Sequence, residues 1–117
     1  MTNSKQQSVL SKEQIDSVIT LFSSGQLEDA LSQALKLTKT CPNHSLVHNV
    51  TGACYAGLGQ LTSAIKSYEK AIELDPNYFK AYYNLGASYQ ELVQYDKSIE
   101  SYQKSISIDP EYAEAHN

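Results

Sequence analysis

Residues 60–78 read QLTSAIKSYEKAIELDPNY, and residues 94–112 read QYDKSIESYQKSISIDPEY. Aligned with an offset of 34 positions, the two stretches share nine of nineteen residues. Proline keeps the same period along the chain, at Pro42, Pro76 and Pro110. A fixed period of this length indicates one supersecondary unit that is copied and stacked. The sequence therefore predicts a repeat protein.

The period divides the chain into a short arm and one repeat domain. We expect a flexible N-terminal arm at 1–10 and the repeat domain at 11–117. The units of this domain are 11–44, 45–78 and 79–112, with the start of a fourth at 113–117. A segment as short as this last one does not form a stable helix on its own. The apolar side of the preceding helix is therefore expected to be uncovered.

Each unit contains two helical patterns. In the third unit, Tyr82, Leu85 and Tyr89 recur at spacings of three and four residues, which places them on one face of a helix. After a short turn the pattern restarts with Tyr95 and Ile99. The unit is thus predicted to be a pair of helices joined by a turn.

Residues typical of helix ends stand between these patterns. Pro76 disfavours helical dihedrals at the residue before it, so the second helix of its unit should end there. Gly57 and Gly59 are expected to close the first helix of the same unit, because glycine adopts the left-handed conformation found after helix ends. Ser11 and Gln14 form a capping-box pattern at the start of the first helix.

Small residues and tyrosines alternate where the paired helices should touch. Gly52 and Gly86 stand where a large side chain would push the two helices apart. Tyr68 and Tyr102 supply bulk from the second helix of each unit. Close packing of the two helices within each unit is the prediction.

These residues are similar to the tetratricopeptide repeat. The resemblance lies in Gly-x-x-Tyr in the first helix, Ala…Tyr…Ala in the second and the closing Asp-Pro, and it spans 11–112. It implies an all-α fold, namely an α-solenoid of antiparallel helix pairs, the TPR superhelix. It also implies a non-enzymatic module for protein–protein interaction.

The first and third units depart from this pattern. In the first unit Val18 replaces the glycine, Ala34 the aromatic residue and Leu37 the small residue, as expected of an end unit that packs on one side only. In the third unit Ser98 and Ser105 replace small apolar residues. Their hydroxyls are expected to bond back to the preceding turn of their own helix and to weaken it locally.

Composition excludes several classes of function. The formal net charge is −4, and all nine cationic side chains are lysine, so a basic surface for nucleic acid is not expected. No apolar run approaches the ~20 residues that cross a bilayer, and none resembles a secretory signal. Two cysteines are too few for a disulfide framework. A cytoplasmic location is the expectation.

Metal and catalytic sites are weakly supported. The spacing Cys41-x2-His44-x3-His48 is compatible with zinc, yet His48 takes the place of Tyr82 one unit later and no fourth ligand is near. Cys54 is interpreted as a small core residue. No converging constellation suggests catalysis. We therefore expect no catalytic, cofactor-binding or metal site.

Stacked helix pairs with a constant rotation form a superhelix, whose inner side is lined by the first helix of each unit. The resemblance implies that this groove binds a peptide segment of a partner protein. The residues expected to face inward are Lys12, Ile15, Ile19, Phe22, Asn49, Ala53, Ala56, Lys80, Tyr83, Asn84, Ala87, Gln90 and Glu91.

Within this set, Asn49, Asn84 and Gln90 suit a peptide backbone, because a carboxamide both donates and accepts. Tyr83 is expected to be exposed and to provide apolar contact. The asparagine ladder of some family members cannot be continuous, since the other two units lack asparagine in the slot of Asn84. A basic clamp on a C-terminal carboxylate would have only Lys12 and Lys80 and is disfavoured.

Three alternatives stay open. Ile15, Ile19 and Phe22 could pack under the N-terminal arm instead of lining the groove, covered by Val9 and Leu10. The chain could be the recruiting or regulatory arm of a larger enzyme, such as a glycosyl- or sulfotransferase. It could also self-associate as a homo-oligomer through the uncovered C-terminal helix pair.

Overall fold

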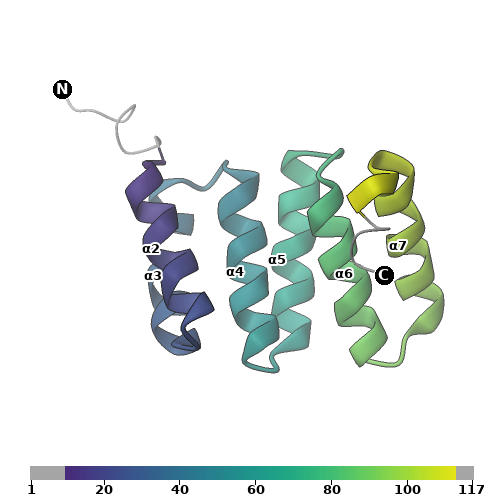
Figure 1. Cartoon of the computed structure of the whole chain (residues 1–117), viewed down its shortest axis with the longest axis horizontal. Coiled ribbons are helices and arrows are strands. Elements are labelled where there is room, and N and C mark those ends of the chain that lie inside the picture. The colour runs from purple at the N-terminus through teal and green to yellow at the C-terminus, as the bar shows by residue number, and fades with distance from the viewer. Residues whose placement is uncertain (1–9, 113–117) are drawn as a thin grey trace.

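The computed structural model describes residues 10–112 of the chain, and within this range every regular element is helical. The helices are α2 (Lys12–Ser23), α3 (Leu27–Thr40), α4 (Ser45–Gly57), α5 (Leu61–Leu74), α6 (Phe79–Glu91) and α7 (Tyr95–Ile108). Figure 1 shows the hairpins α2–α3, α4–α5 and α6–α7 side by side in chain order. The predicted solenoid of antiparallel helix pairs is confirmed. The backbone turns helical again at 110–112, whereas 1–9 of the predicted arm and all of 113–117 lie outside the described residues.

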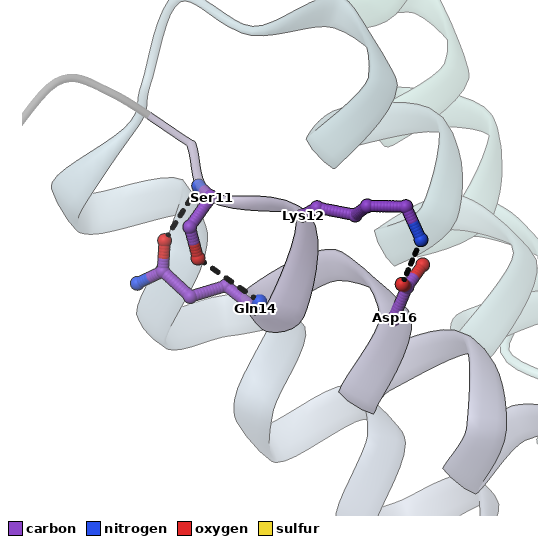
Figure 2. A network of polar contacts seen from close by, with 4 residues as sticks. All are labelled: Ser11, Lys12, Gln14 and Asp16. Atoms are coloured by element: carbon purple, nitrogen blue, oxygen red, sulfur yellow. Dashed lines mark hydrogen bonds and ion pairs between the residues drawn. The ribbon is translucent and has the colours of Figure 1, made fainter.

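The start of α2 has the capping box that its sequence predicts. The Ser11 hydroxyl accepts a hydrogen bond from the backbone N–H of Gln14 at 3.1 Å, and the side-chain carbonyl of Gln14 accepts one from the backbone N–H of Ser11 at 2.9 Å. Figure 2 shows this pair beside a second local contact, in which the Lys12 ammonium lies 2.7 Å from the Asp16 carboxylate. Two otherwise unbonded backbone donors are thus satisfied within the first turn.

The turns inside the hairpins share a backbone conformation but not a residue type. Gly25 and Gly59 have positive φ angles of 84° and 79°. The third hairpin places Val93 there, with a φ of 62°. Cβ makes this left-handed region unfavourable for residues other than glycine. The last hairpin therefore turns at a conformational cost that the first two avoid.

The helices of each hairpin meet where a glycine faces a tyrosine. A Cβ added to Gly52 would lie 2.5 Å from Cε1 of Tyr68, and one added to Gly86 would lie 2.9 Å from Cδ1 of Tyr102. The absence of a side chain thus lets the ring lie directly on the partner helix. In the first hairpin Val18 takes the place of the glycine and is fully buried. The tyrosine there becomes an alanine, so bulk has moved from one helix to the other.

The serines of α7 do not behave as the sequence analysis expects. The hydroxyl of Ser98 donates to the carbonyl of Gly86 at 2.8 Å, and that of Ser105 donates to the carbonyl of Phe79 at 2.9 Å. Both acceptors belong to α6, so these hydroxyls join the two helices instead of bonding back within α7. The expectation of a local weakening of α7 by back-bonding is wrong. Polar contacts hold this hairpin together where the alanines of the second hairpin offer none.

Apolar burial decreases from the N-terminal to the C-terminal end. One core cluster joins α2, α3 and α4, and a smaller one centres on Ala64, Tyr68 and Leu85. Ile65 and Ile72 of α5 pack against this second cluster. Their equivalents on α7, Ile99 and Ile106, are 53% and 42% exposed. Among residues 10–112, the outer side of α7 is therefore an exposed apolar stripe, whereas α6 covers the same side of α5.

Candidate functional site

A hollow of about 320 Å³ lies on the side of the molecule formed by the first helices of the hairpins. We call it the α4–α6 hollow, since most of its lining comes from those two helices. Its lining residues are Phe22, Ala53, Ala56, Gly57, Leu61, Tyr68, Asn84, Ala87, Ser88 and Glu91.

The hollow exists because its floor is built from very small residues. Ala53, Ala56 and Gly57 follow one another along the second half of α4, and Ala87 faces them from α6. None of these side chains extends beyond Cβ. The ring of Tyr68 reaches this surface from α5, because Gly52 leaves room for it to lie across α4. The floor is thus both recessed and largely apolar.

A bonded pair of asparagines connects α4 and α6. The side-chain amide of Asn84 donates to the side-chain carbonyl of Asn49 at 3.1 Å, and Asn49 is only 8% exposed. Burial raises the pKa of Tyr78, and a hydrogen bond with Asn49 partly opposes that rise. Asn49 is therefore a buried residue that holds the side chain of Asn84 in place. Asn84 lines the hollow, and its own carbonyl is not used in the bond to Asn49.

An aromatic cluster lies beyond the hollow at the C-terminal end. The ring centroid of Tyr83 is 5.3 Å from that of Tyr102 and 5.4 Å from that of Tyr112, with edge-on geometry in both pairs. The Tyr102 hydroxyl donates to the side-chain carbonyl of Gln90 at 2.9 Å. Tyr83 is thus half-buried in ring contacts, whereas the sequence analysis expects it to be exposed.

The residues predicted to face inward separate into several groups. Those that line the α4–α6 hollow are Phe22, Ala53, Ala56, Asn84, Ala87 and Glu91. Lys12 is paired with Asp16, while Ile19 and Lys80 are exposed outside the lining. Ile15 is 8% exposed and belongs to the core, so its assignment to the groove is wrong.

Sequence reasoning missed four lining residues: Gly57, Leu61, Tyr68 and Ser88. The sequence pattern places Tyr68 between the two helices of its unit, yet its ring also contributes to the lining of the hollow. Gly52 is the sequence signal for this position of Tyr68, because a ring packed against a glycine can lie across the partner helix and reach its other side. Leu61 begins α5, the second helix of its unit, whereas only the first helix of each unit is expected to line the inner side.

Glu91 is the charged residue among those that line the hollow. The pKa of Tyr68 is raised mainly by burial, and to a smaller extent by Cys54 and by the nearby Glu91 carboxylate. The pKa of Tyr102 is likewise raised by burial and, to a smaller extent, by Tyr83 and Glu91. Glu91 is thus close enough to both tyrosines to disfavour a negative charge on either of them. No lysine contributes to the described lining.

A larger hollow of about 570 Å³ lies between α6 and α7, lined by Tyr82, Leu85, Tyr89 and polar residues of α7. The Lys97 ammonium lies 5.6 Å from the centre of the Tyr89 ring. The pKa of Tyr89 is raised by burial and by Glu69. Lysines and Glu100 alternate along this lining. Its size exceeds that of the α4–α6 hollow, but its mixed charges favour no ligand class.

Cys41, Cys54 and His48 have surroundings typical of structural residues. Burial raises the pKa of the Cys54 thiol to about 11, which suppresses the reactive thiolate at neutral pH. Cys41 is buried, and a ring nitrogen of His48 lies 2.8 Å from the carbonyl of Pro42. Across residues 10–112, no three His, Cys, Asp or Glu side chains gather as metal ligands would.

The described helices also bear on membrane insertion. None of those within 10–112 is both long and apolar enough to span a bilayer.

Two family models match the sequence. The first is described as a TPR repeat and covers residues 52–93, and the second is described as the tetratricopeptide repeat and covers 79–112. Together they extend over 52–112, which is more than half of the chain. No curated protein sequence matches.

Solved structures of similar fold are numerous. A crystal structure of MamA has a TM-score of 0.79 at 29% identity, covering 83% of this chain and 57% of the MamA chain. The Sgt2 TPR domain from Aspergillus fumigatus has a TM-score of 0.80 at 21% identity, covering 86% and 68%. The second TPR domain of human RPAP3, in complex with an HSP70 peptide, has a TM-score of 0.81 at 18% identity, covering 92% and 88%. The chain thus spans little more than half the length of MamA.

Proposed function

Because the chain belongs to the tetratricopeptide-repeat family, we propose that it is a non-catalytic interaction module that binds a segment of a partner protein in the α4–α6 hollow. The observation that carries this proposal is the recessed, apolar floor of Ala53, Ala56, Gly57 and Ala87. Apolar surface removed from water on binding would supply most of the affinity. The carbonyl of Asn84, at the edge of the floor, would accept a hydrogen bond from the partner's backbone.

The human RPAP3 domain gives this proposal a precedent, since it is described in complex with a peptide. At 18% identity, this similarity supports the same fold for the chain but does not indicate the same ligand. In this chain Lys12 is paired with Asp16 and no lysine lines the hollow. The proposal is therefore limited to peptide binding and does not include the HSP70 peptide.

Filling the hollow tests the proposal. Short random peptides displayed on phage would be selected on the wild-type protein, and the dissociation constants of the enriched peptides measured by fluorescence anisotropy. Ala53→Leu combined with Ala87→Leu should weaken binding by about 100-fold or more, because the added side chains occupy the site. The matched control is Ser32→Leu, at an exposed position of α3 outside the lining.

The three proteins should have the same helical content by circular dichroism. Undiminished binding by the Ala53→Leu/Ala87→Leu variant would place the site elsewhere. A selection that enriches no peptide would count against the proposed function itself.

The stripe on α7 favours a second candidate function, which is self-association. Ile99 and Ile106 are exposed, while Ile65 and Ile72 of α5 are packed against the core. A second copy of the chain that covers this stripe would complete the burial that the repeat pattern provides elsewhere.

A further inference from the structure

The chemistry of the α4–α6 hollow also bears on which kind of segment fits it. From its lining we infer that the bound segment carries an aliphatic or aromatic side chain next to a lysine or arginine. The inference rests on the proposed function and adds a ligand class to it. An acidic segment is the alternative that it excludes.

The apolar part of this inference follows from shape. Ala53, Ala56 and Ala87 line the hollow together with the rings of Phe22 and Tyr68, of which Tyr68 is only 2% exposed. A long apolar side chain would fill this space against the alanines and the partly exposed ring of Phe22. A polar side chain would lose its hydration there with few partners to replace the water. An apolar anchor residue is therefore the best match for the floor.

The charged part follows from Glu91. Its side chain is exposed at the end of α6, beside the floor. No ion pair to Glu91 occurs among the described residues. A basic side chain next to the anchor would lie near this carboxylate, whereas an acidic one would be repelled. The net charge of −4 adds to the same preference.

The lysines predicted to face inward lie outside the hollow. The Lys12 ammonium is 2.7 Å from the Asp16 carboxylate, so its charge is already compensated. Lys80 is the second residue of α6 and Glu91 is the last, which separates them by about 16 Å at a rise of about 1.5 Å per residue. An acidic group held at the floor would thus lie beside Glu91 and far from Lys80. The hollow has an anionic edge without a balancing cation.

The test uses parallel selections from the same library of short random peptides. One selection uses the wild-type protein and the other uses Glu91→Lys. Peptides from the wild-type selection should be enriched in lysine or arginine beside a large apolar residue. Peptides from the Glu91→Lys selection should carry aspartate or glutamate at that place. The apolar residue should be common to both sets.

Dissociation constants of the peptides from the wild-type selection complete the test. Glu91→Lys should weaken them about tenfold, with Glu91→Gln in between, and the difference should shrink as salt is added. Glu100→Lys is the matched control, since Glu100 is an exposed glutamate on α7 and lines the other hollow. This control should leave the constants unchanged.

The possible failures are distinguishable. If the wild-type selection shows no excess of basic residues, or if Glu91→Lys leaves the constants unchanged, the ligand class is wrong. In that case Ala53→Leu/Ala87→Leu would still abolish binding, and the proposed function would stand. If that variant binds normally, or no peptide is enriched, the proposed function and this inference both fail.

Discussion

Val93 is the residue at which local backbone preference and the repeat pattern conflict. Its φ of 62° lies where Gly25 and Gly59 occupy the equivalent turns. A β-branched side chain is especially unfavourable in this conformation. The side chain is also 64% exposed, so little packing compensates for the strain. The turn between α6 and α7 thus keeps the geometry of the other turns without their glycine.

Val93→Gly should therefore stabilise the protein by about 1 kcal/mol, because the relief of strain exceeds the added flexibility of the unfolded chain. Urea denaturation followed by circular dichroism would measure the change. Leu92→Gly is the control, since its φ of −83° needs no glycine. That variant should be destabilised by about 1 kcal/mol. A Val93→Gly protein that is less stable than wild type would show that the backbone of Val93 is not strained.

At the scale of elements, the two helices of a hairpin pack through one large and one small side chain, and the hairpins differ in which helix provides the large one. The second hairpin has Gly52 against Tyr68, and the first has Val18 against Ala34 in the same slots. All four residues are buried. Both arrangements fill the seam, since a large side chain on one helix is matched by a small one on the other. They are two solutions to one packing problem.

This equivalence predicts compensation between two substitutions. Gly52→Val should destabilise by about 2 kcal/mol, because the new side chain overlaps the Tyr68 ring. Tyr68→Ala should cost about 3 kcal/mol or more through the cavity that it leaves. The double variant reproduces the first hairpin and should be more stable than the sum of the two losses by at least about 1 kcal/mol. A double-mutant cycle from urea denaturation would measure this, and simple additivity would contradict it.

The repeated pattern was sufficient to predict the helices and their ends. Proline and glycine at a constant period mark the boundaries, and the residues at Ser11 and Gln14 identify a cap by local chemistry alone. The contacts of Ser98 could not be predicted in this way. A hydroxyl in a helix can bond to its own preceding turn or to a neighbouring helix, and the choice depends on a distance that spacing does not give.

The same distinction applies to the candidate site. The small floor residues Ala53 and Ala87 could be predicted, because their slots in the repeat determine the side on which they lie. The half-buried state of Tyr83 could not, since it depends on rings contributed by α7 and by the helical residues 110–112. The bond between Asn49 and Asn84 was also missed, as it joins two units whose relative positions the sequence does not specify.

Over the whole molecule, the two ends of the stack differ in chemistry. By register, Gln14 and Ser17 of α2 take the places of Tyr82 and Leu85, and both are exposed. The N-terminal end is thus polar, whereas α7 presents Ile99 and Ile106. Head-to-tail stacking of two copies would remove these polar side chains from water and place them against isoleucines, which offer no hydrogen bonds to replace it. A two-fold pairing of one α7 with another would bury apolar surface on both sides.

We therefore predict a concentration-dependent dimer in sedimentation-velocity experiments, with weak affinity because a single helix from each copy makes a small interface. Ile99→Lys combined with Ile106→Lys should keep the protein monomeric, since two charges would be placed in the contact. Leu35→Lys with Leu46→Lys is the control, because these leucines are 37% and 39% exposed but lie on α3 and α4. That control should still dimerise. A wild-type protein that stays monomeric at the highest soluble concentration would rule out self-association and leave the stripe on α7 available to a helix from another source.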